Sequence, residues 1–138
     1  RVEVARRAEA PHRVRRDPTR AVAGFQDSMF TAGELDDATR RRIEAMRSGP
    51  PPDPVALQAG LDVLAREDLR AGLAGVDVPV LLLHGEEDAI CPPGAARALA
   101  AAMPRARAEI MPRLGHAPFL SRPGLLARAV LSLPVEAV

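Results

Sequence analysis

The chain of 138 residues has 19 basic and 18 acidic residues, and this near balance gives no electrostatic reason to expect a nucleic-acid partner. Its single cysteine cannot form an internal disulfide, and no Cys or His residues stand at metal-ligand spacing, so neither a metal nor another cofactor is expected. Since no apolar run is long enough to cross a bilayer and no signal-peptide layout opens the sequence, we expect a cytoplasmic protein with no membrane partner.

Residues 1–16 are rich in arginine and lack hydrophobic periodicity, which is typical of a solvated, poorly ordered tail. Glu3 and Glu9 interrupt the positive charge and no aromatic side chain accompanies it, so a nucleic-acid-binding arm is the weaker interpretation. His12 is expected on the exposed surface of this tail. The chain opens on Arg1 rather than Met, and we expect it to begin partway through a longer polypeptide.

Residues 17–75 carry the pattern of three amphipathic helices in series, which resembles the helical lid of an enzyme. Aspartates at the expected N-caps, two of them followed by proline, predict where these helices start. A short helical turn is expected after Asp68 and closes at Gly75. The expected caps and apolar rows are Asp17 with Val22, Phe25 and Met29; Asp36 with Ile43 and Met46, ending at Gly49; and Asp53 with Val55, Ala59, Val63, Leu57, Leu61 and Leu64.

Residues 76–138 carry the order strand, helix, strand, helix, which predicts an α/β fold with a parallel sheet and a right-handed crossover. The continuous apolar run Pro79–His84 is typical of a strand buried on both faces. Ala106–Met111 alternates polar with apolar residues, which predicts a half-exposed edge strand. The helix between the strands is expected from Pro92 and Pro93 to Pro104, and the last helix, from Ser121, is expected to cover the sheet with Leu125, Leu126, Ala129 and Val130.

Asp88 and His116 lie in the loops that follow these two strands. Catalytic side chains gather at the carboxyl edge of a parallel sheet, so we expect the two to converge there. The carboxylate would accept a hydrogen bond from Nδ1 and leave Nε2 to take a proton from a serine hydroxyl. Gly85 and Gly115 would permit the tight backbone this requires. A helix-capping aspartate and a loop histidine bonded to a carbonyl are the alternatives, but strand context, order and spacing together favour a catalytic pair.

Other side chains near this pair are weaker candidates. His84, at the end of its strand, is expected to pack against the site or to support it rather than act as the base. Glu86 and Glu87 are expected to solvate the loop, and Cys91 to be a small buried filler, because neighbouring carboxylates disfavour a thiolate. None of the serines has the G-x-S-x-G setting of a nucleophile; these are Ser28, Ser48, Ser121 and Ser132.

Three stretches of the sequence carry a family resemblance. The first, ALQAGLDVLAREDLRAGLAGVDVPVLLLHGEED, joins a lid helix to the strand that bears the acid. The second is the Asp88 loop with Pro92, and the third is GHAPFLSRP, Gly115–Pro123, whose His-Ala-Pro-Phe core is the most specific. From about Phe25 onward the chain resembles the C-terminal part of an α/β-hydrolase. Within that superfamily it is most similar to the pimeloyl-acyl-carrier-protein methyl ester esterases of biotin synthesis.

This resemblance implies a partial α/β-hydrolase fold: a helical lid followed by the last two parallel strands and their helices. It also implies a serine carboxyl-ester hydrolase in which His116 acts as general base and then acid, while Asp88 orients the imidazole. In that family the lid meets the acyl carrier protein through arginines, for which Arg40, Arg41 and Arg42 are candidates, although a solvated helix face explains them equally well. Phe119 would border the acyl channel or simply pack.

The family's N-terminal strands, oxyanion region and nucleophile elbow are absent from these residues. We therefore expect the C-terminal fragment of such an esterase, inactive in isolation and with an exposed sheet edge beside its first strand. Two alternatives stay open. One is another lidded hydrolase, such as a lactonase or a general carboxylesterase, and the other is a noncatalytic remnant that binds a partner.

Overall fold

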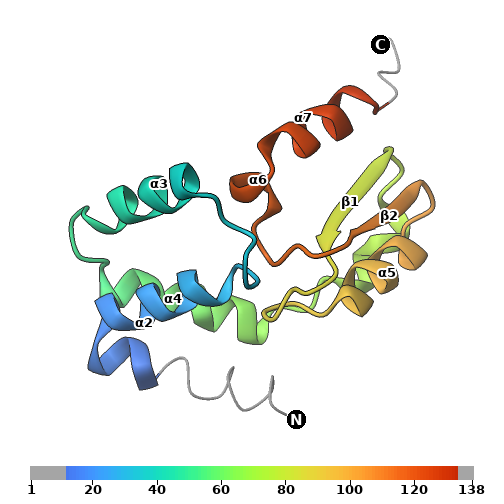
Figure 1. Cartoon of the computed structure of the whole chain (residues 1–138). Coiled ribbons are helices and arrows are strands. Elements are labelled where there is room, and N and C mark those ends of the chain that lie inside the picture. The colour runs from blue at the N-terminus through green and yellow to red at the C-terminus, as the bar shows by residue number, and fades with distance from the viewer. Residues whose placement is uncertain (1–11, 134–138) are drawn as a thin grey trace.

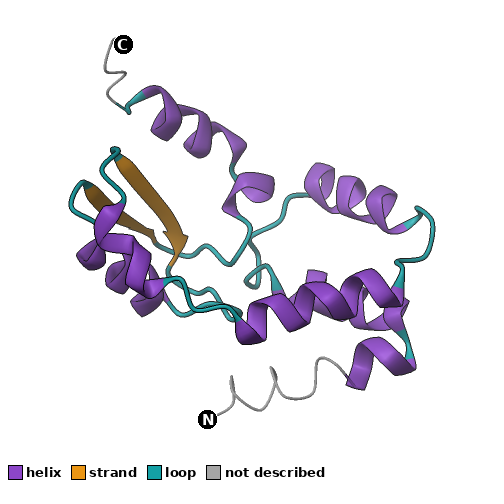
Figure 2. Ribbon diagram, turned by 180° about the vertical axis from the view of Figure 1, so that it is seen from behind, coloured by secondary structure: helices purple, strands orange, loops and turns teal. Residues whose placement is uncertain are grey.

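The computed structural model describes residues 12–133, which form a helical part and a small α/β part (Figure 1). Helices α2 to α4 make up the helical part, and two strands with a helix between them make up the other (Figure 2). None of the helices in this range is long and apolar enough to span a bilayer. The elements are α2 Pro18–Ser28, α3 Asp37–Arg47, α4 Pro54–Arg66, the 3-10 helix η1 Arg70–Gly75, β1 Val80–Gly85, α5 Pro93–Ala102, β2 Ala106–Met111, α6 Pro118–Ser121 and α7 Pro123–Leu131.

Helices α2, α3 and α4, which the sequence predicts to form a lid, begin where expected, because an aspartate caps each of them. Each carboxylate accepts a hydrogen bond from a backbone N–H of the first turn, a donor that the helix itself leaves without a partner. Prolines in the first turns of α2 and α4 suit this position because their fixed φ is already helical. The capping bonds run from the backbone N–H of Arg20 to Asp17 (2.9 Å), of Thr39 to Asp36 (2.7 Å) and of Val55 to Asp53 (2.8 Å).

Strands β1 and β2 pair in parallel, with Val80 opposite Ala106 and Gly85 opposite Met111. Helix α5 connects them and packs against both. Strand β2 alternates between exposed and half-buried residues, as an edge strand should. Strand β1 was expected to be buried on both faces, yet only Gly85 is buried and its other residues are half-buried. The reason is that β1 has one strand neighbour within residues 12–133, so its second edge stays open.

Residues 12–16, which the sequence places in a poorly ordered tail, are helical and precede α2. Val14 is buried and belongs to the small apolar core, which accounts for the order of this piece. His12 is exposed, as predicted. The expectation for residues 1–11 lies outside the part of the chain that the structure describes.

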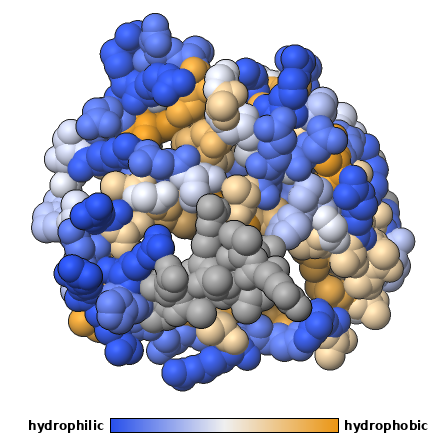
Figure 3. All heavy atoms as spheres, turned by 60° about the horizontal axis from the view of Figure 1, so that its bottom comes forward, coloured by the Kyte–Doolittle hydropathy of each residue, from blue (hydrophilic) through white to orange (hydrophobic). Residues whose placement is uncertain are grey.

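Several predicted apolar rows are exposed. On the lid, Met46 and Leu64 face solvent. On α7, Leu125, Leu126 and Val130 are exposed, the last by 57%, so the prediction that this helix buries them against the sheet is wrong for the described residues. Leu125 and Leu126 instead border an open cleft that residues of β1 also line. Figure 3 shows apolar patches open on one face of the molecule among hydrophilic side chains.

The cap of α3 makes stability depend on pH. Hydrogen bonds from Thr39, the backbone bond first, lower the pKa of Asp36 below its ordinary value of 3.8, with smaller help from Arg122 and Arg42. A carboxylate with a lowered folded-state pKa contributes stability above its unfolded pKa and loses that contribution as pH falls through the folded value. Asp36→Ala should therefore lower the melting temperature near neutral pH, and the difference from wild type should shrink below about pH 4.

Thermal unfolding followed by circular dichroism across this range measures the effect. Asp37→Ala is the matched control, because it removes a carboxylate from the same helix start and leaves the bond between Asp36 and Thr39 in place. A melting-temperature difference for Asp36→Ala that is the same at all pH values would contradict the assignment.

Candidate active site

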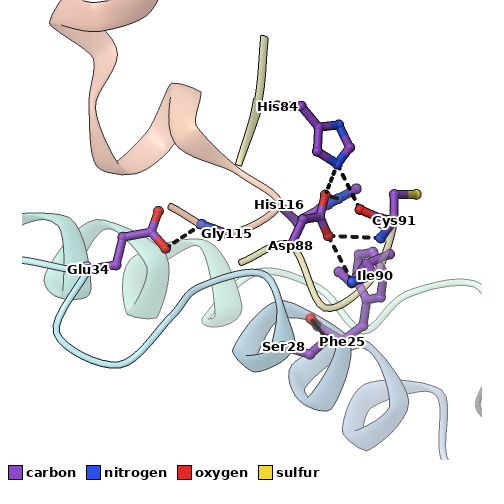
Figure 4. Close-up of polar contacts among 9 residues, drawn as sticks. All are labelled: Phe25, Ser28, Glu34, His84, Asp88, Ile90, Cys91, Gly115 and His116. Atoms are coloured by element: carbon purple, nitrogen blue, oxygen red, sulfur yellow. Dashed lines mark hydrogen bonds and ion pairs between the residues drawn. The ribbon is translucent and has the colours of Figure 1, made fainter. Parts of the chain in front are cut away.

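The loop after β1 buries the carboxylate of Asp88, whose side chain is 2% exposed. Its Oδ1 accepts hydrogen bonds from the backbone N–H groups of Ile90 and Cys91, each at 2.8 Å. Its Oδ2 lies 2.8 Å from Nδ1 of His116, across the site (Figure 4). Both oxygens have partners, so the loop's own backbone fixes the direction in which the carboxylate faces.

His116 is presented by the loop after β2, and its position is fixed at backbone and ring. Its backbone N–H donates to the carbonyl oxygen of Met29 at 2.7 Å. The ring stands edge-on to Phe25, with centroids 6.3 Å apart and an interplanar angle of 74°. A carboxylate only accepts, so Nδ1 carries the hydrogen of the bond to Asp88, and in the neutral ring Nε2 is left as proton acceptor. The predicted convergence of the two side chains is confirmed.

His84 supports the carboxylate from the other side. Its Nε2 lies 2.7 Å from the carbonyl oxygen of Cys91 and 3.3 Å from Oδ2 of Asp88. Both neighbours are acceptors, so Nε2 carries a hydrogen and is not a free base. This agrees with the prediction that His84 supports the site, while the sequence did not show which groups it contacts. Glu86 and Glu87 are exposed, as expected, and Cys91 is half-buried rather than buried.

Gly85 and Gly115 let the two loops touch, as the sequence predicts. A Cβ at Gly85 would lie 2.0 Å from the carbonyl oxygen of Gly115 and 2.2 Å from that of Leu114. A Cβ at Gly115 would lie 2.4 Å from the carbonyl oxygen of Met29. All three obstacles are backbone atoms, which no side-chain rotation removes. The strand end, the histidine loop and the connection between α2 and α3 therefore pack closely together beside Asp88 and His116.

Glu34 is a buried residue of this region that the sequence analysis missed. It lies on the connection between α2 and α3 and is 3% exposed. Its Oε2 accepts a hydrogen bond from the backbone N–H of Gly115 at 2.9 Å, and its Oε1 accepts one from the hydroxyl of Ser121 at 2.5 Å. A glutamate in a loop between amphipathic helices has no local signal that distinguishes it from a solvated one, because two of its partners, Gly115 and Ser121, lie more than 80 positions away.

A cleft of about 320 Å³ opens beside the pair. Its wall includes the ring of His116 and side chains from β1, α6 and α7, among them Leu83, Phe119 and Leu126. Phe119 is half exposed there, at 51%. Apolar walls around a few polar groups are the usual make-up of a small-molecule site.

Two other sets of predicted residues lie away from this cleft. Arg40, Arg41 and Arg42 are exposed on α3 and do not line it. The chain's four serines are all engaged in hydrogen bonds as donors. Ser121 donates to Glu34, and the others donate to backbone carbonyls three or four residues earlier: Ser28 to Phe25, Ser48 to Glu44 and Ser132 to Ala129. Among residues 12–133, no group of three or more His, Cys, Asp or Glu side chains could hold a metal ion.

The family model of the alpha/beta hydrolases matches residues 2–129. The chain belongs to this family. The predicted fold class is confirmed: helices accompany a small parallel sheet, and the acid and histidine follow successive strands in the order that such enzymes use.

Curated relatives narrow the resemblance. The chain is 55% identical over 75 residues to the pimeloyl-[acyl-carrier protein] methyl ester esterase of Nitrosomonas europaea, covering 54% of the chain and 30% of the relative. It is 45% identical over 94 residues to the protein of the same name from Aromatoleum aromaticum, covering 64% of the chain and 38% of that relative. The chain thus spans well under half the length of the curated relatives it matches.

Solved structures agree on the fold. An esterase from Exiguobacterium antarcticum superposes with a TM-score of 0.79 at 22% identity, covering 93% of this chain and 47% of that one. A thermophilic esterase from Thermogutta terrifontis superposes with a TM-score of 0.72 at 26% identity, covering 92% and 47%. The helices and the two strands are therefore arranged as in these two structures.

Because the two loops are in contact, a single methyl group added at Gly85 should strongly lower stability. Gly85→Ala should lower the free energy of unfolding by about 3 kcal/mol, because the added Cβ meets backbone oxygens that can move only with the loop. Gly94→Ala is the control, since a Cβ there meets nothing within 4 Å and should be neutral or stabilise helix α5 by up to about 1 kcal/mol. Guanidinium unfolding measures both variants, and equal stabilities would contradict the close approach.

Proposed function

We propose that Asp88 and His116 are the acid and the base of a serine carboxyl-ester hydrolase that cleaves the methyl ester of a pimeloyl-[acyl-carrier protein]. The observation that carries the reaction type is the 2.8 Å hydrogen bond between Oδ2 of Asp88 and Nδ1 of His116. The name of the curated relatives supports the substrate. The nucleophile would be a serine presented by another segment of the esterase, because the four serines here are engaged elsewhere.

The proton path follows from the two ring nitrogens. As the serine Oγ bonds to the ester carbon, its proton passes to Nε2 of His116, and the imidazolium keeps Nδ1–H on Asp88. The tetrahedral intermediate then breaks its bond to the methoxy group, which takes the proton from Nε2 and leaves as methanol. A water molecule next gives a proton to Nε2 while its oxygen attacks the acyl-enzyme, and serine leaves with that proton as the free acid is released.

The surroundings of the pair suit this sequence of steps. Asp88 is held by two N–H groups of its own loop and by the ring of His84, so it does not turn away when the imidazole becomes charged. The apolar cleft, with Phe119 and Leu126 in its wall, would take the methylene chain of the acyl group.

Loss of either member of the pair should abolish most turnover. In a polypeptide that joins this chain to a nucleophile-bearing segment, Asp88→Asn should lower kcat by about 10⁴-fold, because Asn favours the wrong ring tautomer. His116→Ala should lower kcat by at least about 10³-fold, because no base remains for the serine proton. Hydrolysis of p-nitrophenyl butyrate, with the 138-residue chain alone as the blank, measures both.

Matched controls separate chemistry from charge and folding. Glu87→Gln neutralises an exposed carboxylate one position from Asp88, and His12→Ala removes an exposed histidine. Both should keep wild-type kcat, and all four variants should keep the wild-type circular dichroism spectrum. Near wild-type kcat in Asp88→Asn or in His116→Ala would contradict the assignment of these residues as the acid and the base.

We further propose that the exposed arginines of α3 receive the carrier protein. Arg40 and Arg41 are exposed on α3, and neither lines the cleft beside His116. Exposed cations on one surface steer an acidic partner and raise its association rate, an effect that salt weakens. The proposal concerns Arg40 and Arg41 together, because Arg42 also acts on Asp36.

Charge reversal tests this surface. The double variant Arg40→Glu/Arg41→Glu should lower kcat/KM about 10-fold for a carrier-protein-bound ester and leave a small free ester unaffected. Arg97→Glu, at an exposed position of α5, is the control and should leave kcat/KM unchanged for both substrates. Equal kcat/KM values for the carrier-bound ester in the double variant and in wild type would contradict the proposal.

A further inference from the structure

Glu34 places a carboxyl group in the interior beside the histidine loop. Its Oε2 accepts hydrogen bonds from two backbone N–H groups, that of Thr31 at 2.8 Å and that of Gly115 at 2.9 Å. Its Oε1 accepts the hydroxyl of Ser121. Figure 4 shows the side chain reaching from the lid connection to Gly115, next to the catalytic pair. One side chain thus joins three segments of the chain: the lid, the histidine loop and α6.

The connection between α2 and α3 makes two further hydrogen bonds to this part of the chain. The backbone N–H of His116 donates to the carbonyl oxygen of Met29, and a guanidinium nitrogen of Arg122 donates to the carbonyl oxygen of Glu34 at 2.9 Å. The connection between α2 and α3 therefore contacts the chain before, at and after His116. Of these hydrogen bonds, the one between the Glu34 carboxyl group and the Gly115 N–H holds the residue directly before His116.

A buried carboxyl group is costly unless its oxygens are satisfied, and here three donors satisfy them. All three donors are neutral, and one belongs to the backbone of the loop that carries the base. Removal of the Glu34 carboxyl group would leave the Gly115 N–H without its acceptor, and the loop that carries His116 would relax. Gly115 lies so close to Met29 that only a glycine fits, so its backbone has no side chain of its own to hold it in place.

We propose that Glu34 is a positioning residue for His116, which fixes the Gly115 amide and thereby keeps Nδ1 of the ring on Asp88. This rests on the proposed function of the pair and deepens it. It also links catalysis to the lid, because Glu34 sits between two lid helices and any shift of that connection moves the base. A misplacement of about 1 Å is enough to lower a rate about 100-fold.

Two variants and one control test the effect on turnover in the nucleophile-bearing polypeptide. Glu34→Ala should lower kcat about 100-fold with little change in KM, because substrate contacts stay while the base is displaced. Glu34→Gln keeps a carbonyl oxygen for the Gly115 amide and should recover kcat to within about 5-fold of wild type. Ile43→Ala, which opens a buried position on lid helix α3, is the matched destabilised control and should keep kcat.

A second measurement needs no catalysis and uses the 138-residue chain. In ¹H–¹⁵N spectra, Glu34→Ala should speed hydrogen exchange at the Gly115 amide about 100-fold relative to wild type and shift the imidazole signals of His116. Ile43→Ala should do neither at a temperature where both variants are folded. Absence of hydrolysis in the wild-type polypeptide would contradict the proposed function. The exchange of the Gly115 amide and the signals of His116 would still test the positioning role.

Unchanged Gly115 exchange and unchanged His116 signals in Glu34→Ala would overturn the positioning role. So would a loss of kcat in Ile43→Ala equal to that in Glu34→Ala at equal melting temperature, since the effect would then be one of stability alone. Failure of Glu34→Gln to restore turnover above the alanine variant would also count against it.

Discussion

The hydrogen bond between Asp88 and His116 is the constraint on which the site depends. It joins two loops that are far apart in the chain, and it works only because each loop is fixed independently. The carboxylate is held by two N–H groups of its own turn and by His84, and the imidazole is held through its backbone by Met29. The neutral ring therefore keeps the tautomer in which Nδ1 carries the hydrogen and Nε2 is the acceptor.

That bond in turn requires close packing of backbone against backbone. Gly85 and Gly115 remove the side chains that would keep the strand end, the histidine loop and the lid connection apart. Glu34 then satisfies the amide exposed by this approach. The connection between α2 and α3 is thus bonded directly to the loop that carries His116.

The same arrangement leaves apolar surface uncovered. The outer edge of β1 has no strand beside it within the described residues, and Leu125 and Leu126 of α7 border an open cleft. Strands of this composition are normally covered on both faces and paired on both edges. The small core explains why burial falls short of what the apolar patterns predict, while the positions of the helices and strands hold.

The sequence by itself determined the helix starts at Asp17, Asp36 and Asp53, the order of the two strands, and the pairing of Asp88 with His116. These follow from local rules, since capping, apolar period and chain order at a parallel sheet need no knowledge of distant contacts. Only the tertiary structure decided the contacts of Glu34, the contacts of His84 and the exposure of the apolar rows. Each of these depends on which remote groups come within hydrogen-bonding or packing distance, and no local pattern encodes that.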